Sequence, residues 1–358
     1  MPRDARPVPV ESATADLDRY AAVIDARSPG EFELDHLPGA RNLPVLDDAQ
    51  RAHIGTQYKH AGSFEAKREG AALVARNIAA HLEGSLAALP RDARCLVYCW
   101  RGGNRSGALA TVMARVGWEV DVLEGGYRAF RRQVVADLAE WPARHRFHVI
   151  AGPTGCGKSL LLGQLARLGA QVLDLEALAA HRGSVLGHLP ERPQPSQKRF
   201  ESALWDALRR HDPTRTTYVE SESRKVGQCQ IPEALITSIR GSAEGTVLRA
   251  PEAVRCDLLM QEYRHFIASP ERLLARLPAL AAHHGRERVA EWAALVHEAR
   301  WRELVASLLE HHYDPAYRRS MERNFSRLSD FADLALEAAG ESTISALAGR
   351  LLAAAPAA

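Results

Sequence analysis

The stretch Phe147-His-Val-Ile-Ala-Gly-Pro-Thr-Gly-Cys-Gly-Lys-Ser159 runs from a mostly apolar segment directly into a glycine-rich turn. The turn, residues 152–159, fits the pattern G-x-x-x-x-G-K-[ST], and the leucine spacing of residues 160–168 predicts a helix after it. In this setting backbone N–H groups surround a phosphate, Lys158 neutralises the terminal phosphate, and Ser159 can hold Mg²⁺. We therefore expect an α/β domain with a diphosphate or triphosphate site formed by Gly152, Thr154, Gly155, Gly157, Lys158 and Ser159.

Acidic residues follow the next two predicted strands, residues 171–174 and 217–220, and are candidates for positioning a metal ion, a water or a substrate. Beyond the phosphate loop, no aspartate is preceded by four apolar residues, so the sequence favours a site that binds diphosphate over one that hydrolyses ATP. The motif allows Mg²⁺ and implies no other cofactor, while Cys156 is interpreted as a small residue that the turn tolerates. The acidic candidates are Asp174, Glu176, Glu220 and Glu222.

The chain divides into three predicted parts, residues 1–140, 141–250 and 251–358. Strands alternate with helices in the first two parts, which predicts an open parallel sheet in the first and a second α/β domain after a linker at residues 141–146. The third part has helical spacing only, so we expect a helical region with a frayed alanine-rich tail, residues 351–358. Expected strands are 20–25, 94–99, 119–123, 147–151, 171–174, 217–220 and 245–248; expected helices are 64–88, 106–116, 160–168, 253–267, 270–280, 286–309 and 321–336.

Composition narrows the class of protein. The 358 residues are 46% hydrophobic and 25% charged, which is typical of a soluble globular chain, and no apolar run approaches the ~20 residues that span a membrane. Five scattered cysteines and the lack of an apolar leader segment favour reduced thiols in the cytoplasm. The net charge of +2 excludes a polycation, although a basic set made almost entirely of arginine permits an RNA partner.

A second loop carries a candidate nucleophile. Cys99-Trp-Arg-Gly-Gly-Asn-Arg-Ser106 lies between a predicted strand and a predicted helix, where backbone N–H groups and the helix N-terminus favour a thiolate over a thiol. We expect the pKa of Cys99 to be lowered, and Arg101 and Arg105 to form a fork that binds a tetrahedral anion. Cys95, inside the strand, is expected to be a structural thiol.

The cysteine loop and three other segments resemble the rhodanese family. Residues 25–32 resemble D-x-R-x-x-x-E-[FY], residues 36–44 resemble H-[IL]-P-G-A-x-N-[IL]-P, and residues 124–127 resemble the glycine-rich segment near the end of the domain. The resemblance implies a rhodanese-like open parallel sheet in which Cys99 carries sulfur as a persulfide.

The loop departs from the ordinary rhodanese pattern because Arg105 lies six residues after Cys99, one more than usual. Cys-x5-Arg is also the spacing of phosphatases with a rhodanese fold, and a longer loop suits an anion of phosphate size. A rhodanese-type sulfurtransferase or a Cys-x5-Arg phosphatase, fused to a P-loop kinase-like domain acting on a small molecule, is therefore an alternative. Tyr98, where phosphatases have histidine, weighs against the phosphatase. A non-catalytic, nucleotide-dependent binding module is a further alternative.

Several segments outside the two loops resemble the selenouridine synthase family. Residues 174–184 resemble D-L-E-x-x-A-x-H-R-G-S, residues 220–232 resemble its second-strand segment, and residues 312–317 resemble Y-Y-D-P-x-Y with His312 in place of the first tyrosine. The resemblance implies geranylation of wobble 2-thiouridine in the tRNA anticodon by geranyl diphosphate, followed by replacement of sulfur with selenium from selenophosphate. It assigns the diphosphate to the phosphate loop and selenium transfer to Cys99, Arg101 and Arg105, and an enzyme that supplies selenophosphate is a candidate partner.

Residues that could contact tRNA lie near the phosphate loop and in the helical part. Arginine beside aromatic rings can bind phosphates and stack an unpaired base. The histidine pairs 283–284 and 311–312 lack partner ligands at metal spacing, and we expect no metal there. The tRNA-binding candidates are His181, Arg182, Arg224, Lys225, Tyr313, Tyr317, Arg318 and Arg319, with Arg323 and Arg327 further along the same stretch.

Overall fold

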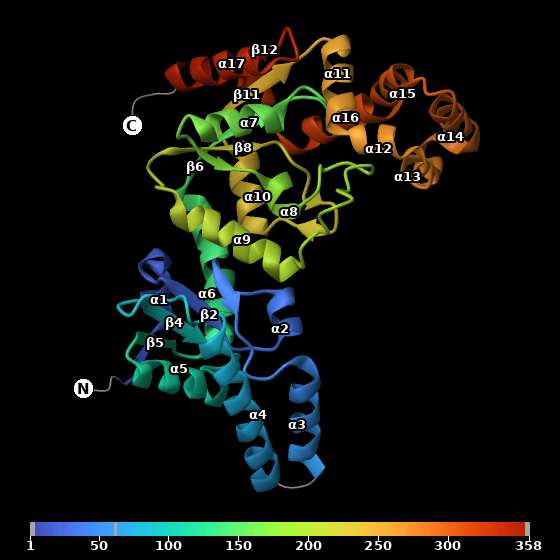
Figure 1. Ribbon diagram of the computed structural model, residues 1–358. Coiled ribbons are helices and arrows are strands. Elements are labelled where there is room, and N and C mark those ends of the chain that lie inside the picture. The colour runs from blue at the N-terminus through green and yellow to red at the C-terminus, as the bar shows by residue number, and fades with distance from the viewer. Residues whose placement is uncertain (1–3, 61–62, 355–358) are drawn as a thin grey trace. The chain divides into compact units, whose positions relative to one another are not determined.

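The computed structural model describes residues 4–60 and 63–354 and divides the chain into two compact units (Figure 1). The first unit is Met1–Asp137 with Ser196–Asp206, and the second is Leu138–Pro195 with Ala207–Ala358. The three-part division at residues 140 and 250 stays a prediction. No described helix is long and apolar enough to cross a membrane.

The first unit contains a five-stranded parallel sheet, as the alternation of strands and helices predicts. Its strand order is β1-β5-β4-β2-β3, so the cysteine-bearing strand β4 is central and its carboxyl end lies beside that of β2. The strands are β1 (Arg6–Val8), β2 (Ala22–Asp25), β3 (Ala40–Asn42), β4 (Arg94–Tyr98) and β5 (Glu119–Leu123). The helices are α1 (Val10–Thr14), α2 (Pro29–Leu34), α3 (Asp48–His60), α4 (Ser63–Glu83), α5 (Asn104–Val116) and α6 (Gly126–Glu140).

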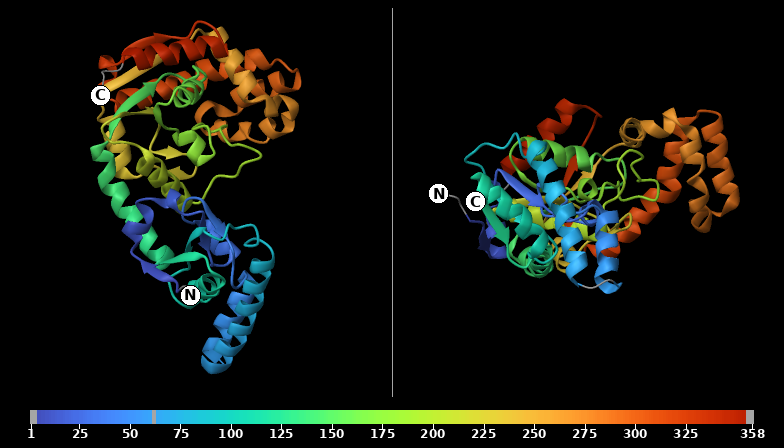
Figure 2. Two further views of the ribbon diagram at one scale, coloured as in Figure 1. Left: turned by 60° about the vertical axis from the view of Figure 1, so that its left-hand side comes forward. Right: turned by 60° about the horizontal axis from the view of Figure 1, so that its bottom comes forward.

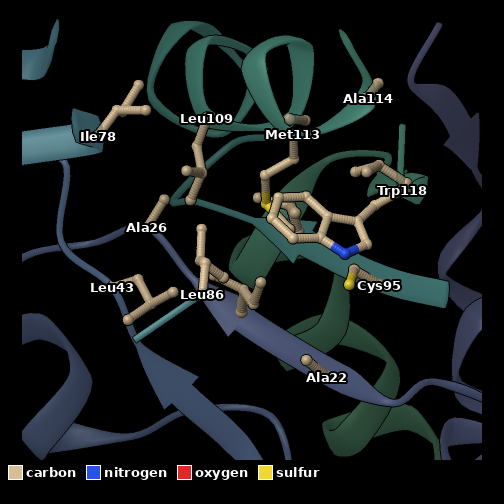
Figure 3. Packing of buried hydrophobic residues seen from close by; sticks show 14 of the residues in the cluster. Ala22, Ala26, Leu43, Ile78, Leu86, Cys95, Leu109, Met113, Ala114 and Trp118 are labelled. Atoms are coloured by element: carbon tan, nitrogen blue, oxygen red, sulfur yellow. The ribbon is translucent and has the colours of Figure 1, made fainter. Parts of the chain in front are cut away.

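The core of this unit lies between the sheet and helix α5. Figure 3 shows Met113 and Trp118 packed with Cys95, whose side chain is fully buried. Burial raises the pKa of the Cys95 thiol to about 11, which fits the structural role expected of it.

The second unit is built on another five-stranded parallel sheet, with the order β12-β11-β6-β8-β7. The phosphate-loop strand β6 lies between β11 and β8. The strands are β6 (Arg146–Ala151), β7 (Gln171–Leu173), β8 (Thr216–Glu220), β11 (Glu244–Arg249) and β12 (Ala332–Ala335), and β9 (Lys225–Val226) pairs antiparallel with β10 (Cys229–Gln230). The helices are α7 (Lys158–Arg167), α8 (Leu175–Ala179), α9 (Gln197–Arg210), whose residues 197–206 belong to the first unit, α10 (Glu233–Arg240) and α17 (Glu341–Ala354).

The third predicted part supplies a group of helices, seen together in Figures 1 and 2. Trp292, Leu304 and Leu308 belong to the apolar cluster that holds this group together. The helices are α11 (Glu252–Glu262), α12 (Arg264–Ala268), α13 (Pro270–Leu274), α14 (Ala281–His297), α15 (Trp301–Leu308) and α16 (Asp314–Asn324), with a π-helical turn at Leu309–Tyr313.

Three expectations for this part are wrong. The predicted helix 321–336 stops at Asn324, and Ala332–Ala335 form strand β12, parallel to β11. The segment has no β-branched residues, and pairing with β11 overrides its local preference. The predicted helix 286–309 is interrupted between α14 and α15, where Ala299 adopts a positive φ of 53°.

The third error concerns the tail. Residues 351–354, where we expected a frayed tail, continue helix α17 and follow Leu347 and Ala348, which are buried in the core that α7 also faces. Residues 355–358 lie outside the described part of the chain.

Candidate functional site

Cys99 lies directly after strand β4, at the base of the turn that leads into helix α5. Its side chain is 4% exposed, and the Ser106 hydroxyl donates a hydrogen bond to its Sγ atom at 3.2 Å. Burial works to raise the pKa of the Cys99 thiol, but hydrogen bonds from the Ser106 side chain and from backbone N–H groups of Ser106, Arg101 and Gly103 outweigh it and lower the pKa. The structure thus has the hydrogen-bond donors around the Cys99 sulfur that the loop sequence predicts.

The segment 124–127 packs against the backbone of the cysteine turn. Gly126 has a φ of +57°, and a Cβ atom on it would lie 2.2 Å from the carbonyl oxygen of Cys99. Tyr127 instead donates its backbone N–H to that carbonyl at 2.8 Å. Only glycine at position 126 therefore allows the two segments to approach this closely.

The two loop arginines differ in their surroundings. Arg101 is exposed, whereas Arg105 is half-buried and donates from Nη1 to the Glu31 carboxylate at 2.7 Å. Burial works to raise the pKa of Glu31, but the hydrogen bonds from Arg105 and Ser28 outweigh it and lower the pKa. Arg105 therefore binds a carboxylate of the chain in the position where we expected it to bind a substrate anion, and Glu31 is a partner that sequence spacing alone does not reveal.

A buried ion pair lies beside the cysteine strand. Arg27 and Asp25 are almost fully buried and contact at 2.6 Å, and the Arg27 guanidinium lies 4.0 Å from the ring centre of Tyr127. The Tyr98 hydroxyl accepts a hydrogen bond from the backbone N–H of Leu37 at 3.1 Å. This hydrogen bond joins residues 36–44 to the cysteine strand. Tyr98, which stands where phosphatases have histidine, therefore has a structural role.

The phosphate loop joins β6 to α7, as the sequence predicts. Gly157 caps the helix with a φ of +89°, and Lys158 folds back so that Nζ donates to the carbonyl oxygen of Gly152 at 2.8 Å. Cys156 is fully buried, and burial raises the pKa of its thiol, in keeping with the non-nucleophilic role expected of it.

A buried arginine from the helical part contacts the phosphate loop. Arg255 is 7% exposed and donates from Nε to the carbonyl oxygen of Thr154 at 2.9 Å. Its Nη1 donates to Asp314 at 2.9 Å. Arg255 follows no motif that marks it in the sequence, and only the fold brings it to Asp314 and the phosphate loop.

Three of the four acidic candidates converge on the phosphate loop. Ser159 donates to Glu176 Oε2 at 3.1 Å, and the backbone N–H of Glu176 donates to Glu220 Oε1 at 2.8 Å. Burial and then the charge of Glu176 raise the pKa of Glu222 to about 8. Burial and the neighbouring carboxylates raise the pKa of Glu220 well above its usual range. Asp174 has a different task, since its carboxylate caps α8 by accepting from Ala177 N at 2.7 Å.

A cavity of about 680 Å³ opens over this loop. Lys158, Ser159, Glu176 and Glu222 form its polar side, and Leu258, Leu259 and Met321 contribute apolar surface. Of the residues proposed to bind tRNA, Arg182, Tyr313 and Tyr317 line it. The hydroxyl of Tyr317 is buried, close to Gly152 and Ser221.

The other tRNA candidates lie away from the cavity wall. His181 is buried and forms an isolated β-bridge with His188, and Arg224 forms an ion pair with Glu233. Arg182, which does line the cavity, forms an ion pair with Glu262. Lys225, Arg318 and Arg319 are exposed. In the histidine cluster, His284 and His312 approach to 2.9 Å between ring nitrogens, and no group of three histidine, cysteine or acidic side chains suited to a metal occurs among the described residues.

The two sites define a class of protein: a rhodanese-like domain with an acidic cysteine joined to a phosphate-loop α/β domain. Family models agree, because residues 10–133 match the rhodanese-like domain and residues 145–333 match the tRNA 2-selenouridine synthase AAA domain.

Curated proteins match over most of the chain. A tRNA 2-selenouridine synthase from Shewanella sediminis is 31% identical over 335 residues, covering 86% of this chain and 89% of that protein. One from Bdellovibrio bacteriovorus is 32% identical over 347 residues, covering 84% and 89%. A third, from Nitrosomonas europaea, is 33% identical over 279 residues, covering 76% and 72%. The chain belongs to the tRNA 2-selenouridine synthase family.

Proposed function

We propose that this protein is a transferase that converts wobble 2-thiouridine of tRNA to 2-selenouridine in two steps, with geranyl diphosphate as alkyl donor and selenophosphate as selenium donor. The observation that carries the proposal is the pairing, in a chain of this family, of an acidified cysteine in an anion-binding turn with a diphosphate loop whose cavity is apolar and aromatic on its other side. The reaction would take place in the cytoplasm, where an enzyme that makes selenophosphate could supply the donor.

In the first step, the thiocarbonyl sulfur attacks C1 of the geranyl donor. A sulfur–carbon bond forms, the carbon–oxygen bond breaks, and diphosphate leaves with the electron pair, while the uracil ring loses its N3 proton to a base. The phosphate loop assists because Lys158 and the backbone N–H groups stabilise the charge that develops on the departing diphosphate. Alkylation also turns a poor sulfur leaving group into a good one.

In the second step, selenium of selenophosphate attacks C2 and geranylthiol leaves with the electron pair and a proton. Water then cleaves the phosphorus–selenium bond, releasing phosphate and leaving the selenocarbonyl. The turn around Cys99 has the donors to hold the phosphoryl end of selenophosphate, and the Cys99 side chain at its base would direct the selenium toward C2. Arg101, which is exposed, is the cation available to that anion, because Arg105 is paired with Glu31.

Mg²⁺ fits the donor set at the phosphate loop. The Ser159 hydroxyl and the Glu176 carboxylate, 3.1 Å apart, supply hard oxygen ligands, and the ion would take its remaining ligands from diphosphate and water. When bound, it would neutralise charge on the leaving diphosphate.

The division of labour is tested by product analysis on wobble-thiolated tRNA. Cys99→Ala should lose selenium incorporation while it retains geranylation, and Lys158→Ala should lose geranylation. Cys95→Ala, which removes a buried thiol from the core of the same unit, is the control and should retain both activities. Loss of both activities in Cys99→Ala, with an unchanged control, would contradict the assignment.

A further inference from the structure

A second, smaller cavity of about 70 Å³ adjoins the one over the phosphate loop. The two share four lining residues, Thr154, Leu259, Tyr263 and Tyr313. Beyond these shared residues, the wall of the small cavity is apolar throughout. The anion-binding loop therefore leads into a space without charged side chains.

One face of helix α15 forms a wall of this space. Trp301, Leu304, Val305 and Leu308 line it, at the i, i+3, i+4 and i+7 spacing of a single helix face. Leu304 and Leu308 are buried, while Val305 is half-buried. Helix α13 contributes Leu273 to the lining.

The lining decides which part of a diphosphate ester can enter. A nucleoside carries ribose hydroxyls and base edges that need hydrogen-bond partners, and burying them against leucine and tryptophan would be costly. A hydrocarbon chain needs no partner and gains about threefold to fourfold in affinity for each buried methylene. The cavity therefore suits the tail of an amphiphilic diphosphate.

We propose that this apolar pocket holds the far end of the prenyl chain of the alkyl donor and that Leu304 and Val305 on α15 set the chain length it accepts. The inference rests on the proposed function and deepens it, because it assigns residues to donor specificity. The diphosphate lies on residues 152–159, and the chain passes Leu259 and Tyr263 into the pocket.

Binding measurements test the pocket apart from catalysis. Calorimetry on the full chain should show geranyl diphosphate binding at least a hundredfold more tightly than inorganic pyrophosphate. Val305→Trp, which places a large side chain at a half-buried position of the face, should reduce that advantage to tenfold or less and leave pyrophosphate binding unchanged. Leu280→Ala removes a buried side chain from the same apolar cluster outside the pocket lining, and it should preserve the advantage.

Competition on 2-thiouridine tRNA tests chain length. Leu304→Ala enlarges the pocket and should raise the ratio of farnesyl to geranyl transfer about tenfold, while Val305→Trp should raise the ratio of dimethylallyl to geranyl transfer similarly. Unchanged ratios and an unchanged binding advantage in Val305→Trp would overturn the pocket assignment even if the wild type geranylates tRNA. A wild type that binds geranyl diphosphate through this pocket but transfers no prenyl group would refute the proposed function and leave the pocket supported.

Discussion

The acidity of Cys99 depends on hydrogen-bond donors and not on a charged neighbour. The Ser106 hydroxyl and the backbone N–H groups of Arg101, Gly103 and Ser106 face the sulfur and oppose the effect of burial. Burial raises the pKa of each of the other four cysteines, including Cys156, where it outweighs two backbone N–H donors and the charges of Lys158 and Arg255. Cys99 is therefore expected to react first with a thiol reagent at neutral pH.

This difference predicts a pH dependence. The rate of Cys99 alkylation by iodoacetamide follows the thiolate fraction, so a lowered pKa places the midpoint of the rate below that of a free thiol. Ser106→Ala removes one donor to the thiolate and should move the midpoint upward by about one pH unit. The measurement is labelling rate against pH, read by mass spectrometry of the Cys99 peptide.

Ser106→Thr retains the hydroxyl and serves as the matched variant, with a midpoint close to that of the wild type. If the wild-type midpoint lay at the free-thiol value, or if Ser106→Ala left it in place, hydrogen bonding would not be the cause of the acidity.

Among single residues, the sequence reveals those whose position is fixed by a motif. Cys99, Lys158 and Ser159 lie where the patterns predict, because each follows a strand by a set number of residues. Arg255 and Glu31 could not be found in this way. Their partners, Asp314 and Arg105, are 59 and 74 residues away along the chain, and only the folded structure brings them together.

Strand β12 and helix α17 complete the phosphate-loop domain from the far end of the chain. Leu336 follows the strand and approaches the loop, since a Cβ atom on Gly157 would lie 3.2 Å from its side chain. Helix α17 packs along α7, the helix that begins with Lys158 (Figure 2). The last elements of the sequence therefore support the first loop of the domain.

A single truncation should show this support. Leu347→Ala removes a side chain that is 5% exposed in the core shared with α7, and we expect a loss of about 2–5 kcal/mol in the free energy of unfolding of the second unit. The measurement is urea dependence of hydrogen exchange in residues 146–151 of strand β6. Leu168→Ala, at a side chain that is 50% exposed, should change stability by less than about 0.5 kcal/mol. Equal effects of the two substitutions would show that α17 contributes no packing.

The elements that sequence predicts well are those with strong local signals. Strands β4 and β6 are mostly apolar, and both lie inside their sheets with a neighbour on each side. Strand β12 has an edge position, four residues and one buried side chain, Leu334, so its sequence pattern is weak. The break at Ala299 is equally hidden, because alanine favours a helix and only the packing of α15 on α11 and α14 requires the turn.

For the whole molecule, the net charge of +2 requires any tRNA to be bound by a local patch. Arg318 and Arg319 are exposed on α16, while Tyr317 and Ser320 of the same helix line the large cavity. A basic surface thus borders the proposed site of alkylation, and it can hold phosphates while a base enters the cavity.

Charge removal there should change the salt dependence of tRNA binding. Replacing both Arg318 and Arg319 with glutamine should reduce the slope of log K against log salt by about 1.5, since each phosphate contact contributes about 0.7–0.9. Arg302→Gln, at an exposed arginine paired with Asp257, is the control and should leave the slope unchanged. An unchanged slope in the double variant would remove α16 from the tRNA-binding surface.

The central claim is that one chain first alkylates the wobble thiouridine and then exchanges its sulfur for selenium. The most direct measurement is mass spectrometry of that nucleoside after 2-thiouridine tRNA is incubated with the protein and geranyl diphosphate, and then with selenophosphate. We predict S-geranyl-2-thiouridine after the first addition, 2-selenouridine after the second, and no selenouridine when the geranyl donor is omitted. Formation of selenouridine without the donor, or of neither product with both, would contradict the account.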